Sequence, residues 1–371
     1  MKKSLIYSFV FSVLLLFSLH IIVPDKDFSE NENRKLKGFP KFSVESLING
    51  EFRDEFEEYI ADQFPLRNVF VGIKSYVEKI IGKKENNGVY IAADDYFIKK
   101  MDGYNKDLLN RNVSYINDLA KEYNVSVALA PTALTILKDK LPSFSEYENE
   151  EQFLKEFYSM LDDNILKIDL IDALNKHNDE YVYYKTDHHW TGLGAYYAYE
   201  EIVSKIKEKS IPLNEFREEI LSDSFLGTLY SKGNFFYANK DVMKTYHYDK
   251  MDFTINYVYE DDIDNTFYKR DCLLIKDKYS VFFGGNHPAI KITNNVLEDN
   301  SKIVIIKDSY ANSLVPFLSN HYKEIHMIDL RQFNGDVRAY LDENELKDVL
   351  ILYNANGLSR DNNIHKLRKR K

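Results

Sequence analysis

The sequence predicts an α/β fold in which a parallel sheet is covered by helices. An apolar strand at 125–130 is followed by a helix at 150–161 and a second strand at 165–170. Strands that alternate with helices in this way become parallel neighbours, with the helices on the sheet faces. The same order returns later, where the strongly apolar run at 303–306 leads into a helix over 311–319.

Other stretches fit the same class. Apolar residues recur at helical spacing from 43 to 81 and are interrupted at Pro65, which predicts two helices joined there. The β-branched and aromatic run at 89–98 predicts a strand pair. The remaining expected helices cover 108–123, 132–138 and 192–207, and the remaining strands cover 181–184, 280–283, 290–292, 325–328 and 349–353. Residues 211–279 have weak periodicity, which predicts an insertion or lid.

Length and charge narrow the class of protein. With 371 residues, 44% of them hydrophobic, the chain can bury a full core as one large domain, alone or with a small appendage. The net charge of −10 argues against a nucleic-acid partner, because affinity for phosphate backbones comes from clustered Lys and Arg. Cys272 is the only cysteine, so no intramolecular disulfide and no thiolate metal cluster is expected.

The N-terminal residues predict attachment to a membrane. Residues 4–23 contain no Asp, Glu, Lys or Arg and are long enough to cross a bilayer once. Lys2 and Lys3 precede them, which by the positive-inside rule sends the rest of the chain outside the cell membrane. We expect an anchor at 1–23, a polar stalk at 24–40 and one domain at 41–371. A cleaved signal peptide is the alternative and would make the protein secreted.

The first candidate site is Asp187-His188-His189-Trp190, between a predicted strand and a predicted helix. Residues two apart in extended backbone point to the same side, so Asp187 can accept a hydrogen bond from His189, while His188 points away. Zinc ligation by these three residues is a weaker alternative, because neighbouring side chains would point apart. Neither a metal nor a cofactor is expected. Trp190, the only tryptophan, is expected either to stack on a sugar or to pack in the core.

The second candidate site is the turn after the strand at 303–306, where Ser309 precedes a helix. A strand, a sharp turn with Ser and a helix expose a nucleophile in α/β hydrolases, although such a Ser can also simply cap the helix. The N–H of Tyr310 and the amide of Asn286 are the expected oxyanion donors. Gly285 would let the backbone approach the substrate closely, although Gly-Gly-Asn is also a common turn.

These motifs resemble a known family. The chain resembles DHHW-type members of the alginate O-acetyltransferase group at four places. They are Asp187-His188-His189-Trp190, Lys307-Asp308-Ser309-Tyr310, and two N-terminal stretches, Glu-Asn-Arg at 32–34 and Asp-Gln-Phe-Pro-Leu-Arg at 62–67. The resemblance runs from about residue 30 to residue 354. It implies an SGNH-hydrolase-like sheet with a permuted order of catalytic elements, in which Asp187 and His189 precede Ser309. Lys307 and Asp308 depart from the Gly- or Thr-containing turn of the related enzymes.

The resemblance also implies an activity. It implies an O-acetyltransferase that moves an acetyl group through a Ser309 acyl-enzyme to hydroxyls of a secreted or cell-surface polysaccharide. A membrane-bound O-acyltransferase is the implied acetyl-donor partner. An acetyl esterase would use the same residues, because transfer and hydrolysis differ only in whether sugar or water receives the acyl group. A non-catalytic polysaccharide-binding subunit of a secretion complex is the third alternative, and the identity of the polymer stays open.

Overall fold

The computed structural model describes residues 2–207, 209–260 and 262–369. The chain divides into two compact units. One consists of Met1–Lys83 with Tyr230–Ala238, and the other of Lys84–Leu229 with Asn239–Lys371.

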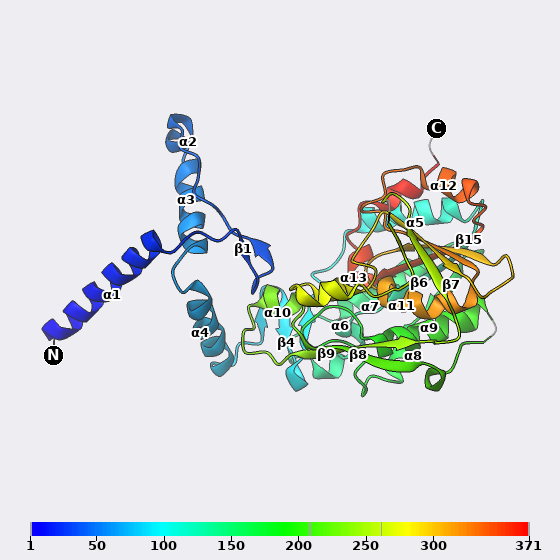
Figure 1. The fold of residues 1–371 in the computed structure, drawn as a ribbon, viewed down its shortest axis with the longest axis horizontal. Helices are drawn as coiled ribbons and strands as arrows, with labels where there is room; N and C mark the ends of the chain where they lie inside the picture. The colour runs from blue at the N-terminus through cyan, green and yellow to red at the C-terminus, as the bar shows by residue number, and fades with distance from the viewer. Residues whose placement is uncertain (1, 208, 261, 370–371) are drawn as a thin grey trace. The chain divides into compact units, whose positions relative to one another are not determined.

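The second unit is built on an eight-stranded sheet (Figure 1). Five neighbouring strands are parallel, in the order β14-β13-β15-β6-β7, and β12, β10 and β11 extend one edge in antiparallel fashion. In chain order the strands are β6 (Asn124–Ala130), β7 (Leu166–Asp169), β10 (Phe253–Tyr257), β11 (Asp262–Asp264), β12 (Ala289–Asn294), β13 (Lys302–Lys307), β14 (Glu324–Ile328) and β15 (Asp348–Asn354). The predicted α/β class is therefore confirmed.

Helices cover this sheet. α9 (Gly192–Ile206) packs against α11 (Ala311–Leu318), while α5 (Lys106–Leu119) and α12 (Val337–Glu343) both contact the short C-terminal turn η7 (Ile364–Leu367). α7 (Glu148–Met160) contacts α5 and the short helix α6 (Ala133–Ile136). The central strand β13 is buried along nearly its whole length, as expected for a parallel strand with helices on both faces.

The strand order creates a switch point at β13. The chain passes from β13 to β14 on one side, and from β14 it crosses back to β15 on the other side of β13. In open α/β sheets, ligands bind at such a point, beyond the carboxyl ends of the strands. The residues that follow β13, β14, β15 and β6 therefore meet at one edge.

Two predicted strands are absent, and part of the predicted lid belongs to the sheet. Residues 181–184 are irregular apart from one isolated bridge between Tyr183 and Trp190. Most of 280–283 lies in or next to the 3₁₀ turn η5 (Lys278–Val281). Within 211–279, β10 and β11 extend the main sheet, while β8 (Arg217–Phe225) and β9 (Asp241–His247) form a separate antiparallel pair. The predicted strand pair at 89–98 is confirmed as β4 (Val89–Ile91) and β5 (Phe97–Lys99), which form a small sheet with β3 (Glu85–Asn86).

The first unit begins with α1 (Lys2–Ile22), which by length and composition can cross a membrane. It continues through a short hairpin, β1 (Phe28–Ser29) and β2 (Arg34–Lys35), to α2 (Val44–Ile48), α3 (Glu51–Asp62) and α4 (Arg67–Ile80). The predicted helix break at Pro65 is present, and Gly50, with a φ of 89°, makes a second one.

Ion pairs fasten this hairpin to the junction of α3 and α4. Arg34 binds Asp62 with an N–O distance of 2.5 Å, and Arg67 binds Glu32. Arg67 is therefore a structural residue, and the polar stretch 24–40 contains a folded hairpin. The Glu-Asn-Arg and Asp-Gln-Phe-Pro-Leu-Arg motifs are partners in one cluster.

Candidate active site

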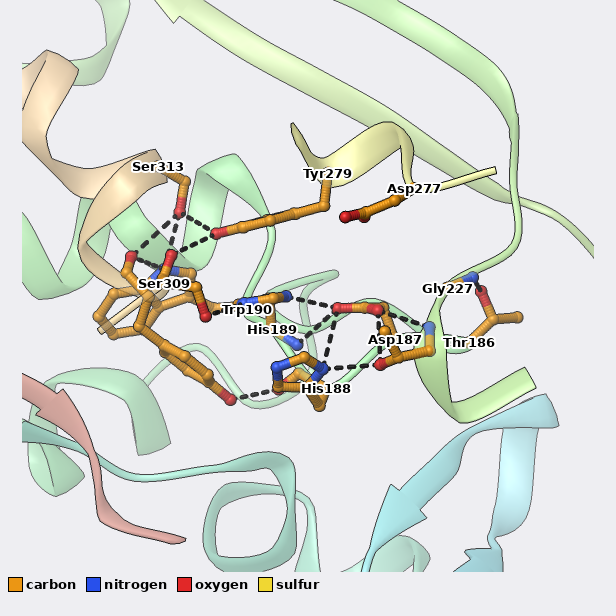
Figure 2. Close-up of polar contacts among 12 residues, drawn as sticks. Thr186, Asp187, His188, His189, Trp190, Gly227, Asp277, Tyr279, Ser309 and Ser313 are labelled. Carbon is orange, nitrogen blue, oxygen red and sulfur yellow. Dashed lines mark hydrogen bonds and ion pairs between the residues drawn. The ribbon is translucent and has the colours of Figure 1, made fainter. Parts of the chain in front are cut away.

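The structure brings Ser309, His189 and Asp187 together (Figure 2). Ser309 lies in the short turn between β13 and α11. His189 Nε2 is 2.8 Å from Ser309 Oγ, and His189 Nδ1 is 2.6 Å from Asp187 Oδ1. Asp187 and His189 are buried. A hydroxyl, an imidazole and a carboxylate in this order form the arrangement that activates a serine nucleophile.

The backbone that presents Asp187 is bent rather than extended. Asp187 Oδ1 accepts a hydrogen bond from the backbone N–H of His189 at 3.0 Å and another from the ring Nδ1–H. One carboxylate oxygen therefore fixes both the backbone and the ring of His189. Its other oxygen accepts the N–H of Thr228 at 2.7 Å and the Thr228 hydroxyl at 2.9 Å. The pairing of Asp187 with His189 agrees with the sequence-based expectation, but strand alternation is not its cause.

His188 does not point away, which corrects the prediction. Its ring centroid lies 3.9 Å from that of His189, and its Nδ1 is 2.7 Å from Thr228 Oγ1. His188 lines the cavity in front of Ser309. The alternation rule fails here because the segment at 185–189 is a series of bends.

Burial and neighbouring groups set the charges at the site. Burial alone would raise the pKa of Asp187, but the imidazoles of His188 and His189 and the donated hydrogen bonds outweigh it and hold the pKa well below its usual range. Burial, together with the nearby His189, lowers the pKa of His188 to about 3. At neutral pH the carboxylate is therefore charged and His188 is neutral.

Tyr279 forms one wall of the site and was not identified from the sequence. Its ring stacks on the His189 imidazole with centroids 3.7 Å apart and planes 5° apart. Its hydroxyl lies 3.1 Å from Ser313 Oγ and 3.2 Å from the carbonyl oxygen of Ser309 (Figure 2). Tyr279 is one of 28 tyrosines, so no local pattern distinguishes it.

Trp190 belongs to the core. Its side chain is fully buried, and its Nε1–H donates to Ser313 Oγ at 2.9 Å. A buried ring cannot stack on a sugar, so the expected substrate-binding role of Trp190 is wrong. The alternative, a core tryptophan behind the site, is what the structure shows.

The predicted oxyanion donors also differ from the structure. The N–H of Tyr310 donates to Asp308 Oδ1 at 2.9 Å, and Asn286 Oδ1 accepts from Lys307 Nζ at 2.8 Å. Among the described residues, those lining the cavity at Ser309 include neither Asn286 nor Gly285. The Gly285 carbonyl instead faces the amide of Asn312, 3.4 Å away. The N–H of Tyr310 is therefore engaged by Asp308. Asn286 and Gly285 fail as site residues because they lie outside the set of described residues that lines the cavity.

Asp308 connects the ends of two strands. Besides Tyr310 N–H, this buried carboxylate accepts the backbone N–H of Asn354 at 2.8 Å and its side-chain amide at 2.6 Å. The turn after β13 is thereby tied to the end of β15.

Within the described part of the chain, the N–H of Ser309 itself has no hydrogen-bond partner, which leaves it available to a ligand.

A cavity of about 370 Å³ opens at Ser309, where the strand order predicts a site. Arg331, which follows β14, and Asn356, which follows β15, line it with Ser309. Arg331 is held in place by Asp329 through contacts of 2.8 and 2.5 Å. Both cavity residues were missed from the sequence, because their approach to Ser309 depends on the sheet order.

The metal alternative is weakened by these contacts. Asp187, His188 and His189 do place ligand-type atoms within 4.8 Å of one another. However, both oxygens of Asp187 and both ring nitrogens of His189 already take part in hydrogen bonds. These contacts hold the His189 ring with Nε2 toward Ser309 Oγ.

Comparisons with known proteins agree with the fold. The family model described as DHHW protein matches residues 87–328. The crystal structure of a DHHW family protein from Eubacterium siraeum is 25% identical, covering 76% of this chain and 95% of that chain, with a TM-score of 0.66. Bacillus cereus PatB1, in a structure with a sulfonyl adduct, is 24% identical over 76% of this chain and 98% of that chain, with a TM-score of 0.64. No curated protein sequence matches.

The family model spans both Asp187-His188-His189-Trp190 and Ser309. The likeness to the Eubacterium siraeum structure extends over most of the chain. The chain belongs to the DHHW family.

Proposed function

We propose that this protein is a serine O-acyltransferase that acetylates hydroxyls of a secreted or cell-surface polysaccharide. The observation that carries the proposal is the pair of hydrogen bonds that joins Ser309 Oγ to His189 Nε2 at 2.8 Å and His189 Nδ1 to Asp187 at 2.6 Å. The alternative, in which Ser309 only caps helix α11, does not account for the histidine imidazole that contacts its hydroxyl.

The first half of the reaction forms an acyl-enzyme. His189 Nε2 takes the Ser309 proton while Oγ attacks the carbonyl of an acetyl donor, and the leaving group departs with that proton. Asp187 stays ionised, because its pKa is low, and stabilises the imidazolium through Nδ1–H. The N–H of Ser309, which has no hydrogen-bond partner among the described residues, is the oxyanion donor that we propose.

The second half transfers the acetyl group. A hydroxyl of the acceptor gives its proton to His189 and attacks the Ser309 ester, which regenerates the free serine. The cavity beside Ser309 is lined by amide and guanidinium side chains, including Asn356, Asn362 and Arg331, and such a lining fits a hydroxyl-rich acceptor.

The setting of the reaction follows from α1 and from the family resemblance. An N-terminal span with Lys2 and Lys3 before the apolar run would anchor the enzyme in the cell membrane with its catalytic unit outside. Acetyl groups must then reach the outside, and a membrane-bound O-acyltransferase is the partner that we propose as donor.

The test separates transfer from hydrolysis. The full chain in detergent is incubated with a small activated acetyl ester and with de-O-acetylated polysaccharide from the producing cell. Ester-linked acetyl on the polymer and free acetate are both measured. We expect acetyl on the polymer and none with Ser309→Ala. Free acetate without acetyl on the polymer would identify the protein as an esterase. If no ester is turned over, the protein is a non-catalytic polysaccharide-binding subunit.

A further inference from the structure

Helix α4 has an apolar face that the first unit leaves uncovered. Six large apolar side chains on this helix and its C-cap are between 47 and 74% exposed. They are Val69, Phe70, Ile73, Val77, Ile80 and Ile81. A helix advances about 100° per residue, so spacings of three, four and seven place them on one stripe.

The neighbouring side of α4 is occupied. Gly72 faces the ring of Phe236, Tyr76 packs edge-on against Tyr237, and Lys79 Nζ lies 4.3 Å above the Tyr237 ring. These contacts lie within the first unit. The segment at 230–238 therefore holds the helix on one side and leaves the apolar stripe open.

The exposed apolar residues are concentrated in this unit. Phe39, Phe42, Leu47 and Ile48, which lie shortly before α3, are also exposed. Exposed large apolar residues in the second unit are fewer and far apart along the chain, apart from the neighbouring pair Leu274 and Ile275. A contiguous apolar surface of this kind marks an interaction site.

We propose that the apolar stripe of α4 lies in the outer leaflet of the membrane that α1 crosses. The stripe and α1 belong to the same unit, and residues 23–66 connect them. Helical spacing places Lys74 on one border of the stripe, where its ammonium group can reach lipid headgroups while the apolar side chains enter the acyl region. The proposal rests on α1 as a membrane span and is independent of the catalytic activity.

The experiment uses the full chain in liposomes, with the only native thiol removed by Cys272→Ser. Ile73→Cys carries an environment-sensitive fluorophore on the stripe, and Asn68→Cys carries it on the opposite side of the same helix. We expect a blue-shifted emission at position 73 that brominated lipids quench at least twofold more strongly than at position 68. Val77→Cys repeats the measurement if Ile73→Cys does not fold.

Two results would overturn the proposal. A blue shift at position 73 without quenching by brominated lipids would mean that protein covers the stripe, either a second copy or another chain. Emission typical of water at both positions 73 and 77 would mean that the stripe stays in solvent.

Discussion

At the scale of single residues, the two carboxylates beside Ser309 have different tasks. Asp187 is surrounded by donors and imidazoles, which lower its pKa and keep it charged. Burial raises the pKa of Asp308, which holds the turn after β13 through Tyr310 N–H and the two donors of Asn354. In the proposed mechanism Asp187 orients the base His189, whereas Asp308 fixes the backbone that carries the nucleophile Ser309.

Tyr279 provides a test at this scale. Tyr279→Leu removes the ring that stacks on His189 and lets the imidazole turn away from Ser309 Oγ. We expect kcat/KM for a small acetyl ester to fall by about 10²-fold, the size of effect expected from a small misplacement of a catalytic group. Tyr279→Phe keeps the ring and should lose about tenfold or less, because only the hydroxyl and its contacts with Ser313 and Ser309 are removed. Equal losses in both variants would show that stacking is not what positions His189.

At the scale of elements, the site depends on close contact between two loops. Gly227 donates its N–H to Thr186 Oγ1 at 3.0 Å, and the next residue, Thr228, donates to Asp187. A Cβ on Gly227 would lie 2.3 Å from Asp187 Cβ and 2.4 Å from Asp187 Oδ2. Only glycine fits between these loops without moving the carboxylate.

The expected result for Gly227→Ala is therefore a loss of activity with little loss of fold. Displacing Asp187 disorients His189, and we expect acetyl-ester turnover to fall by about 10²-fold or more. Circular dichroism should remain native. Gly38→Ala is the matched control, because a Cβ there meets nothing within 4 Å. Full activity in Gly227→Ala would mean that the loops are not packed in this way.

The elements also show what a sequence can and cannot predict. The strands β6, β13, β14 and β15 were predicted because their continuous apolar runs are local signals. The bends at 185–189 were missed, because the buried Asp241 causes them from a distance. Asp241 accepts the N–H groups of Lys185 and Thr186 at 2.9 and 2.8 Å, and nothing near residue 185 in the sequence reveals that partner.

At the scale of the whole molecule, the site joins segments that are far apart in the chain. Ser309 and His189 are 120 positions apart, and Thr228 and Tyr279 come from the region that was expected to form a lid. Ser309 lies in the turn after β13, whose two neighbouring strands are parallel to it, whereas His189 comes from a loop. The motifs alone could single out Ser309 and His189 as candidates, but the cavity residues required the sheet order.

Stability should depend on pH through buried neutral histidines. Burial lowers the pKa of His188 to about 3 and that of His321 to about 4, from 6.5 in both cases. Between pH 6.5 and 4 the unfolded chain therefore binds protons that the folded chain does not. The free energy of unfolding should fall as the pH is lowered, by up to about 1.4 kcal/mol per pH unit for each group.

Urea unfolding between pH 7 and 4 measures this dependence. His321→Gln should make the slope shallower, because one of the two groups no longer titrates. A free energy of unfolding that stays constant from pH 6.5 to 4 would show that these histidines are protonated in the folded protein.

The most direct test of the account is covalent trapping of Ser309. The full chain is treated at pH 7 with a sulfonyl fluoride, a reagent that sulfonylates activated serines, and the adduct is located by peptide mass spectrometry. We predict one adduct, on Ser309, that is absent in Ser309→Ala and forms at least about 10³-fold more slowly in His189→Ala and Asp187→Asn. Labelling of another residue, or of Ser309 at an unchanged rate in His189→Ala, would contradict the assignment of Ser309 as the activated nucleophile.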